Sequence, residues 1–388
     1  MQTSTSIPEP IDAEPIAARR SHASRIVILA DDLTGACDSG VAFLRSGRRV
    51  RVVLDISSFD TSSMSDPTAE SGQVWSFTTE SRNVSVEEAT RCLTESMLKL
   101  PHADSLFFKK VDSAARGHLG TEIVATLRAS SAAIALVAPA FPAAGRTVQA
   151  GILRVSDFTG QNSTTSLHDL FPREAEVQID ILPIGTIDEI DRGIAAAIAN
   201  GIEILLCDTN TQEHLHDLAV AALRLQKPIL WAGSAGLAHA LAEELLAAYP
   251  ACIGNQPIAS RPGRNLLFVG TPHPVTRLQV SRLDPSTHET CLIKHGSTSE
   301  EGIRTTFQSS PVSALILTGG DTAAFVLRSL KASSILLCGE VAHGIPWGIV
   351  EGGLADGCVV ITKSGGFGDP EALVQAFEFC ARRQREST

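Results

Sequence analysis

Short apolar runs rich in isoleucine, valine and leucine alternate along the chain with amphipathic stretches. This alternation is typical of parallel strands that are buried on both faces and joined by helical crossovers, so the predicted fold class is α/β. In the first two thirds of the chain it predicts strands at Arg25–Ala30, Arg51–Leu54, Val74–Phe77, Leu106–Phe108, Ala133–Ala138, Ile202–Cys207 and Pro228–Trp231. Helical periodicity lies between them, near Gly35–Ser46, Val86–Leu100, Leu119–Ala129, Thr211–Leu225 and Ser234–Ala248.

A break in this pattern divides the chain. Residues 249–264 combine prolines with Gly, Ser and Asn, which interrupts the periodicity and indicates a connection between domains. We predict an N-terminal domain over 25–248, a linker or hinge over 249–262 and a C-terminal domain over 263–384. Each should have a largely parallel sheet flanked by helices, with an active site in the cleft between the domains. The second domain has predicted strands at Asn265–Val269, Ala314–Leu317, Ser334–Leu337 and Val359–Thr362, and a last helix from Pro370 to about Arg383.

Two segments lack such periodicity. Residues 1–24 contain early prolines and no apolar core of a signal peptide, so we expect a disordered leader. Residues 154–179 are polar, and we expect them to run over the surface outside the core.

The charge balance narrows the class of partner. The 388 residues include 32 Lys and Arg against 43 Asp and Glu, a formal net charge of −11 that opposes binding to nucleic acid or anionic membranes. A small molecule is therefore the expected partner, and the sequence leaves a homodimer open. Eight cysteines without a CxxC pair indicate reduced thiols, which fits a cytoplasmic location. An anionic substrate would require cations that are concentrated locally.

Two adjacent carboxylates, Asp31 and Asp32, follow the first predicted strand. Ligands bind at the carboxyl ends of the strands in an open α/β sheet, so this pair is placed to accept hydrogen bonds or to coordinate a cation. Helix capping is the alternative, because Asp is an ordinary N-cap residue, although capping needs only one short polar side chain.

Positive charge gathers after a later strand, in the segment FKKVDSAARGHLG at residues 108–120. Lys109, Lys110 and Arg116 lie there between a strand and a helix, and they supply the cations that an acidic or phosphorylated substrate requires. Ser81 and Arg82, after the third predicted strand, are a weaker signal of the same kind. A solvated basic turn is the alternative.

Two glycine-rich turns follow strands of the second domain, in LTGGDT at residues 317–322 and TKSGG at 362–366. Glycine lets backbone amides approach a phosphate closely, and a helix N-terminus adds partial positive charge. Steric needs alone explain one such turn, but two in one small domain favour a nucleotide site. Neither turn matches a Walker A or Rossmann fingerprint, which disfavours a P-loop NTPase and an ordinary dehydrogenase.

Together these segments resemble the four-carbon acid sugar kinase family over nearly the whole chain. Six motifs occur in the family's order: ADDLTGACDSG at 30–40, SR at 81–82, FKKVDSAARGHLG at 108–120, PAFPAAGRTVQAGILRV at 139–155, GGDTA at 319–323 and TKSGGFGDP at 362–370. GSAGLA at 233–238 and GEVAHGIPWG at 339–348 also look like family segments.

The resemblance implies an ATP-dependent kinase, assisted by Mg²⁺, that phosphorylates a terminal hydroxyl of threonate, erythronate or 3-oxo-tetronate. It implies that the N-terminal domain binds the sugar and the C-terminal domain the nucleotide. The residues that the resemblance assigns to the sugar site, together with Lys110, which we add from the basic segment, are Asp31, Asp32, Ser81, Arg82, Lys109, Lys110, Asp112 and Arg116. The residues that the resemblance assigns to the nucleotide site, together with Thr271 and Lys363, which we add from nearby turns, are Thr271, Gly319, Gly320, Asp321, Thr322, Lys363, Gly365 and Gly366.

For the reaction we hypothesise that Asp32 orients or deprotonates the attacking hydroxyl. Arg82 and Arg116 would fix the substrate carboxylate, and Lys109 or Lys110 would screen developing charge. No residue is assigned to a metal.

The sequence departs from the family pattern in two places. The family usually has a serine-rich turn where Gly270-Thr271-Pro272-His273-Pro274 stands here, and the prolines remove two amide donors. The basic segment has Ala114-Ala115 where the family more often has Thr-Leu, which affects pocket shape.

Two other classes remain open. A non-catalytic sensor that binds an acid sugar or nucleotide is the alternative function, and the altered turn at 269–276 keeps it open. An NAD(P)-dependent dehydrogenase fits the α/β class alone, and the absent dinucleotide fingerprint disfavours it.

Overall fold

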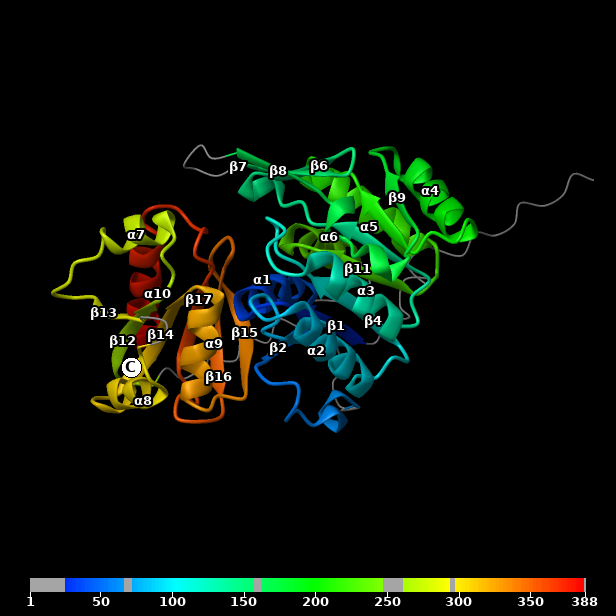
Figure 1. Ribbon diagram of the computed structural model, residues 1–388. Helices are drawn as coiled ribbons and strands as arrows, with labels where there is room; N and C mark the ends of the chain where they lie inside the picture. Colours follow the sequence, from blue (N-terminus) through cyan, green and yellow to red (C-terminus); the bar gives the residue numbers. More distant parts are fainter. Residues whose placement is uncertain (1–24, 66–71, 157–161, 247–260, 294–296, 387–388) are drawn as a thin grey trace, which may run out of the picture.

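One continuous sheet runs through the molecule. The computed structural model describes residues 25–65, 72–156, 162–246, 261–293 and 297–386. Its strands form a 14-stranded sheet in the order β13-β12-β14-β17-β16-β15-β2-β3-β1-β4-β11-β5-β10-β9. Figure 1 shows two lobes, with β12 to β17 and α7 to α10 in one and β1 to β11 and α1 to α6 in the other. The α/β prediction is confirmed.

The N-terminal lobe has a parallel sheet with a buried centre. Five apolar residues of β1, Ile26 to Ala30, are at most 1% exposed, because helices cover both faces of the strand. The strands are β1 (Arg25–Ala30), β2 (Arg49–Val53), β3 (Gln73–Thr78), β4 (Ser105–Lys110), β5 (Ile134–Ala138), β9 (Ile179–Leu182), β10 (Ile204–Cys207) and β11 (Ile229–Gly233). The helices are α1 (Leu33–Ala42), α2 (Val86–Lys99), α3 (Leu119–Ala129), α4 (Ile187–Ala199), α5 (Gln212–Arg224) and α6 (Ala235–Leu246).

The C-terminal lobe has four parallel strands followed across the sheet by an antiparallel hairpin. The parallel strands are β12 (Arg264–Val269), β13 (Glu289–Leu292), β14 (Val312–Thr318) and β17 (Val359–Lys363). The hairpin consists of β15 (Ser334–Ala342) and β16 (Ile345–Glu351). The helices are α7 (Pro274–Val280), α8 (Glu300–Gln308), α9 (Gly320–Ser329) and α10 (Ala372–Glu386).

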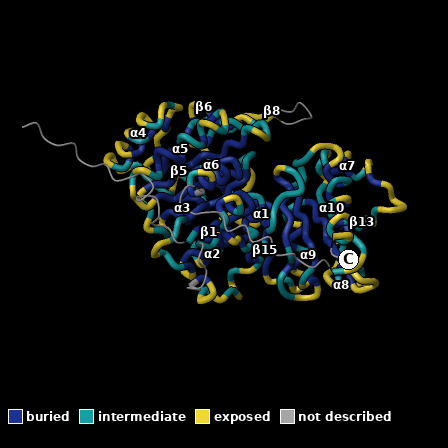
Figure 2. The backbone as a smooth tube through the Cα atoms, turned by 180° about the vertical axis from the view of Figure 1, so that it is seen from behind, coloured by how far each residue is buried: buried dark blue, intermediate teal, exposed yellow. Residues whose placement is uncertain are grey.

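The two lobes share this sheet through one antiparallel pairing. We expected a sheet in each domain, but β15 pairs with β2, with Ser334 opposite Val53, so the two sheets join edge to edge. Helix α1 lies across this seam at Gly40, where an added Cβ would be 3.1 Å from both Leu337 Cδ1 and Val50 Cγ1. One hydrophobic core cluster accordingly contains residues of both lobes, seen as the dark interior in Figure 2.

The described parts of residues 154–179 contain more structure than their polarity predicts. They complete a three-stranded antiparallel sheet of β6 (Arg146–Gln149), β7 (Ile152–Ser156) and β8 (Asn162–Ser166). Leu167 and Phe171 are buried in a core cluster with Val148 and Ile123, so the prediction that this segment lies outside the core is wrong there. Leu167 and Phe171 are isolated among polar residues, so the sequence has no periodic pattern there that would predict a buried element.

Two further predictions fall on other parts of the chain. The leader over 1–24 and most of the linker over 249–262 lie outside the described residues. Within the described ranges, no helix combines the length and apolar character needed to cross a membrane.

Candidate functional site

The predicted charged residues meet at the carboxyl ends of β1, β3 and β4, three neighbouring parallel strands. Asp32, Arg82, Lys110 and Asp112 line a cavity there, which is closed on the other side by residues of the C-terminal lobe, including Phe367. The cavity has a volume of ≈ 20 Å³, about the space of one water molecule. The two lobes are therefore in close contact at this site.

Arg82 is the centre of the charged cluster. Its Nε and Nη2 donate to the two oxygens of Asp31 at 2.7 and 2.9 Å, and its Nη1 donates to Asp32 Oδ2 at 2.6 Å. Asp112 Oδ2 lies 3.6 Å from Nη2, and the Arg82 side chain is 13% exposed. Three carboxylates thus surround one guanidinium that is largely shielded from solvent.

This arrangement sets the protonation of the acids. Burial acts to raise the pKa of Asp31, but the Coulombic attraction and hydrogen bonds of Arg82 outweigh it and hold the pKa below its usual value. Burial likewise opposes ionisation of Asp112, whose pKa is nevertheless held well below its usual range by Arg82 and Arg116. Both side chains are carboxylates at neutral pH.

Asp32 both accepts a hydrogen bond from Arg82 and caps helix α1. It is the N-cap of α1, where Oδ1 accepts from the Gly35 amide at 2.8 Å and Oδ2 accepts from Thr34 Oγ1 at 2.9 Å. The capping alternative is therefore correct for Asp32, but it leaves Asp31 unexplained. Asp31 makes its side-chain hydrogen bonds to Arg82, so the first acid of the pair holds the guanidinium.

Ser81 and Lys109 lie beneath the site. Lys109 is fully buried, with Nζ 2.7 Å from Glu122 Oε2, and Ser81 Oγ donates to Glu122 Oε1 at 2.6 Å. Neither side chain is among those that line the cavity. Sequence reasoning missed Glu122, although an acid in the first turn of α3 directly after the basic segment was a usable signal.

Lys110 and Arg116 differ in exposure. Lys110 is buried and lines the cavity, and its Nζ donates to the Val111 carbonyl at 2.9 Å. Arg116 pairs with Asp112, with Nη2 2.6 Å from Oδ2, but its side chain is 59% exposed. The alternative of a solvated basic turn thus fits Arg116 in part and does not fit Lys110.

The first glycine-rich turn touches Asp32. Gly319 has a φ of 93°, a conformation that glycine adopts easily, and it begins α9 as its N-cap. Gly320 is so close to the other lobe that an added Cβ would clash with Asp32 Oδ2. Asp321 is held by Asn83 Nδ2, which donates to Asp321 Oδ2 at 2.9 Å. The positive end of the α9 dipole therefore faces the carboxylate of Asp32.

The second glycine-rich turn packs against Thr271 and His273. A Cβ added at Gly365 would be 2.7 Å from Thr271 Oγ1, and one added at Gly366 would be 3.1 Å from His273 Nε2. Thr271 also lies against Gly319, so it contacts both turns. Thr322 is buried against Gly270 and lies near Gly319 as well.

Lys363 supports this turn from below. It is 1% exposed, and its Nζ donates to the carbonyls of Ser364 and Phe367 at 2.9 and 3.0 Å. Burial lowers the pKa of Lys363 to about 7. Because its donors are directed to the turn, Lys363 positions the glycines and does not line the cavity.

The two turns fit a phosphate chemically. In the described arrangement Asp32, Thr271 and His273 lie against Gly320, Gly365 and Gly366, so a phosphate would reach these backbone amides only when those contacts open; the α9 N-terminus favours an anion. Mg²⁺ prefers carboxylate oxygens, and Asp32 and Asp112 carry such oxygens at the same cavity. The residues present are thus of the types that hold a metal–nucleotide complex.

Asp38 is a cavity residue that sequence reasoning did not assign. It lies on α1, and its Oδ1 is buried with no hydrogen-bond partner among the described residues. Burial raises its pKa to about 7; Lys110 opposes this shift, whereas Glu340 and Asp32 add to it. An acid inside the apolar helix α1 was the signal that could have identified it.

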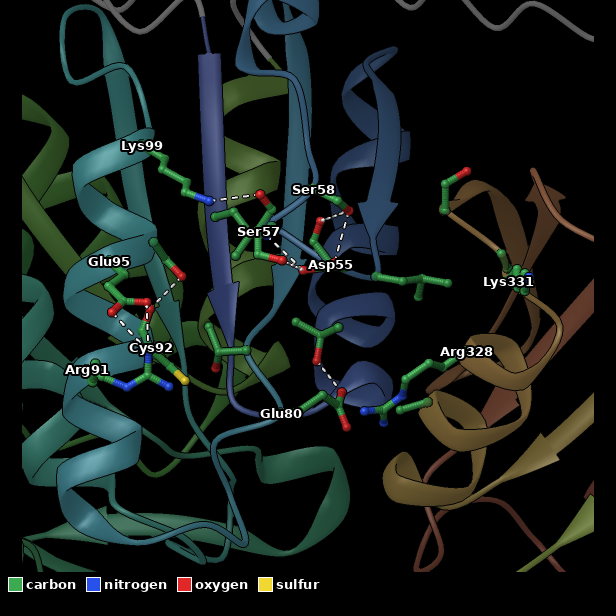
Figure 3. A pocket seen from close by; sticks show the side chains of 18 residues that line it. Asp55, Ser57, Ser58, Glu80, Arg91, Cys92, Glu95, Lys99, Arg328 and Lys331 are labelled. Atoms are coloured by element: carbon green, nitrogen blue, oxygen red, sulfur yellow. Dashed lines mark hydrogen bonds and ion pairs between the residues drawn. The ribbon is translucent and has the colours of Figure 1, made fainter. Parts of the chain in front are cut away.

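A larger cleft lies beside the charged cluster. Its volume is ≈ 680 Å³, within the range of small-molecule sites, and it lies between α2, α9 and the ends of β2 and β3. Figure 3 shows Glu80 near Arg328, with Lys99 and Lys331 on opposite sides of the cleft. Burial raises the pKa of Glu80 to about 7. Sequence reasoning did not predict this cleft, because its residues come from separate segments of ordinary composition.

Comparisons with known proteins agree with this two-part site. A family model described as a sugar-binding N-terminal domain matches residues 26–241, and one described as a nucleotide-binding C-terminal domain matches residues 297–373. The chain is 29% identical to a D-threonate kinase of Bordetella bronchiseptica, over 94% of this chain and 98% of that protein. It is 26% identical to a 3-oxo-tetronate kinase of Pseudomonas fluorescens, over 90% of this chain and 95% of that protein.

A solved structure shows the same fold. Protein HI1011 of Haemophilus influenzae matches with a TM-score of 0.64 and 18% identity, over 92% of this chain and all of that one.

Proposed function

The chain belongs to the four-carbon acid sugar kinase family and is a kinase, and from this premise we propose that it transfers the γ-phosphoryl group of ATP to a hydroxyl of a four-carbon acid sugar. Threonate, erythronate and 3-oxo-tetronate are the candidate acceptors. The observation that carries this proposal is the contact between Gly320 and Asp32. It brings the start of α9, on the nucleotide side, to the acidic cluster on the sugar side.

Phosphoryl transfer requires an aligned hydroxyl and neutralised phosphate charge, with little covalent work for the protein. Mg²⁺ bound with ATP would supply part of that neutralisation. Asp32 would orient the acceptor hydroxyl or accept its proton, and its contact with the start of α9 supports this role. Lys110 is better placed than Lys109 to screen charge, because Lys110 lines the cavity and Lys109 is bound to Glu122.

The substrate carboxylate would compete for Arg82. In the described arrangement Asp31 occupies two donors of the guanidinium, and Asp112 lies 3.6 Å from one of them. An acid sugar would exchange with one of these carboxylates or approach Arg116, whose side chain is exposed. The small cavity requires the contact between the lobes to open at this edge for entry and to close again for transfer, which also excludes water, while the pairing of β2 with β15 keeps the lobes joined.

The test uses the full chain with ATP, Mg²⁺ and a panel of four-carbon acids, with ADP release as the readout. We expect release with at least one acid, and a loss of about 10²- to 10⁴-fold in kcat for Asp32→Asn. Asp169→Asn is the matched control, since its side chain is 78% exposed. Absence of ADP release with every acid would contradict the proposal. Calorimetry that showed tight ligand binding without turnover would instead support a non-catalytic sensor.

A further inference from the structure

Three side chains that the proposed reaction does not use meet where the two lobes touch. His239 lies on α6 of the N-terminal lobe, and Glu340 and His343 lie on or beside the β15–β16 hairpin of the C-terminal lobe. One potential ligand atom of each lies within 4.8 Å of the other two. The imidazole rings of His239 and His343 have centroids 5.5 Å apart. Residues about 100 positions apart therefore converge on one point.

The imidazole of His239 is buried, and one of its nitrogens lacks a hydrogen bond. The residue is 8% exposed, and Nε2 has no hydrogen-bond partner among the residues that the structure describes. Burial, and then the neighbouring His343 and Arg45, lower the pKa of His239 to about 4, so the imidazole is neutral at pH 7. A buried nitrogen without a partner is costly, and a bound ligand would remove that cost.

Negative charge faces the same point. Glu340 Oε1 accepts a hydrogen bond from the Gly344 amide at 2.8 Å, which fixes the carboxylate beside the histidines. Asp38 Oδ1 lies 3.8 Å from the Cβ position of Gly344 and has no partner within the described part of the chain. A cation between the carboxylates would relieve their mutual repulsion.

We propose that His239, Glu340 and His343 bind one divalent first-row transition ion of the Zn²⁺ class and so tie α6 to the β15–β16 hairpin. Two imidazoles and one carboxylate form a ligand set that suits Zn²⁺ and leaves a fourth position for water. Mg²⁺ prefers oxygen ligands, so this ion is distinct from the one that accompanies ATP. Because the ligands come from both lobes, the bound ion would hold the lobes in contact.

Calorimetry with Zn²⁺ alone tests the site, on the full-length reduced chain without ATP or sugar. We expect one ion per chain for the natural sequence. His239→Gln and His343→Gln should each weaken binding by at least about tenfold, since even the loss of an outer-shell partner costs that much. His168→Gln, whose side chain is 68% exposed, is the matched control and should bind as the natural chain does.

Two further measurements keep the test decisive. Co²⁺ in place of Zn²⁺ should give a visible spectrum without thiolate charge-transfer absorption, which separates this site from the eight cysteines. Zn²⁺ should raise the melting temperature of the natural chain and of His168→Gln, and not that of His343→Gln, which alters an exposed residue and should fold normally. Equal Zn²⁺ affinity in the natural chain and in both site variants would overturn the proposal, whatever the ADP-release test with four-carbon acids gives.

Discussion

The two edges of the candidate site differ in chemistry. The N-terminal edge, at the ends of β1, β3 and β4, consists of charged side chains, with Arg82 bound between Asp31 and Asp32. The C-terminal edge, formed by the start of α9 and the turn after β17, consists of glycines and hydroxyls. Its buried cation, Lys363, meets carbonyls instead of carboxylates.

This difference matches two kinds of ligand recognition. Charged side chains with fixed hydrogen-bond directions can select a small acid by its carboxylate and hydroxyls. Only an acid whose groups match these directions can take over the hydrogen bonds that the site residues otherwise make to one another. Backbone amides at glycines suit phosphates, which many nucleotides share. The charged edge should therefore determine the choice of acid, and the glycine edge should determine the geometry of transfer.

Loss of the central cation should have the largest effect. Arg82→Ala leaves three carboxylates without their shared partner, so we expect the free energy of unfolding to fall by about 3–5 kcal/mol and kinase turnover to be lost. Denaturant unfolding and ADP release measure the two effects. Arg91→Ala is the control, since Arg91 pairs with Glu88 and Glu95 on an exposed helix face. Equal stability of both variants would mean that the buried cluster is not a unit.

The cation of the glycine edge predicts a dependence of stability on pH in the alkaline range. The pKa of Lys363 falls to about 7 in the folded chain, so between this value and its ordinary value of 10.5 the unfolded chain binds more protons. The free energy of unfolding should therefore rise with pH across this window, and the cost of burying Lys363 is fully present below about pH 7.

Lys363→Met removes this contribution. From pH 7 to pH 10 we expect the natural chain to gain about 2–4 kcal/mol relative to the variant, measured as the difference between their unfolding curves under reducing conditions. Lys99→Met is the control, because Lys99 is exposed and donates to the Ser57 carbonyl. A constant difference across the window would show that Lys363 keeps its proton in the fold.

A methyl group at the contact between the edges should have a smaller effect. Gly320→Ala places a Cβ against Asp32 Oδ2, and we expect it to cost about 1–3 kcal/mol and to reduce kcat more than it changes KM for ATP. Gly302→Ala is the matched control. Gly302 lies in the first turn of α8, and the nearest atom to its added Cβ is 3.4 Å away. Unchanged kcat for Gly320→Ala would mean that the lobes need not close this tightly.

The sequence predicted the edges better than the roles within them. Strands such as β1 were found to the residue, because an apolar run buried on both faces has a strong pattern. The groups at Asp32 and Arg82 were found because strand ends collect ligand-binding residues. Lys109 and Lys363 could not be distinguished from site residues, since a lysine that is sealed in the interior and one that faces a cavity look the same in one dimension. Glu340 and His343 lie on the β15–β16 hairpin, and no local sequence pattern shows that this hairpin packs near His239 on α6.

The seam that joins the two edges provides the smallest predicted effect. Arg51 on β2 pairs with Glu351 at the end of β16, with Nε 2.7 Å from Oε2, but the two side chains are 28% and 31% exposed. We expect Arg51→Ala to lower the free energy of unfolding by about 1 kcal/mol or less, and to lower it less at high salt. Backbone pairing of β2 with β15 and the shared core should keep the lobes together, so unfolding should remain one transition. Two separate transitions in the variant would show that this ion pair, and not the continuous sheet, makes the charged and glycine edges fold as one unit.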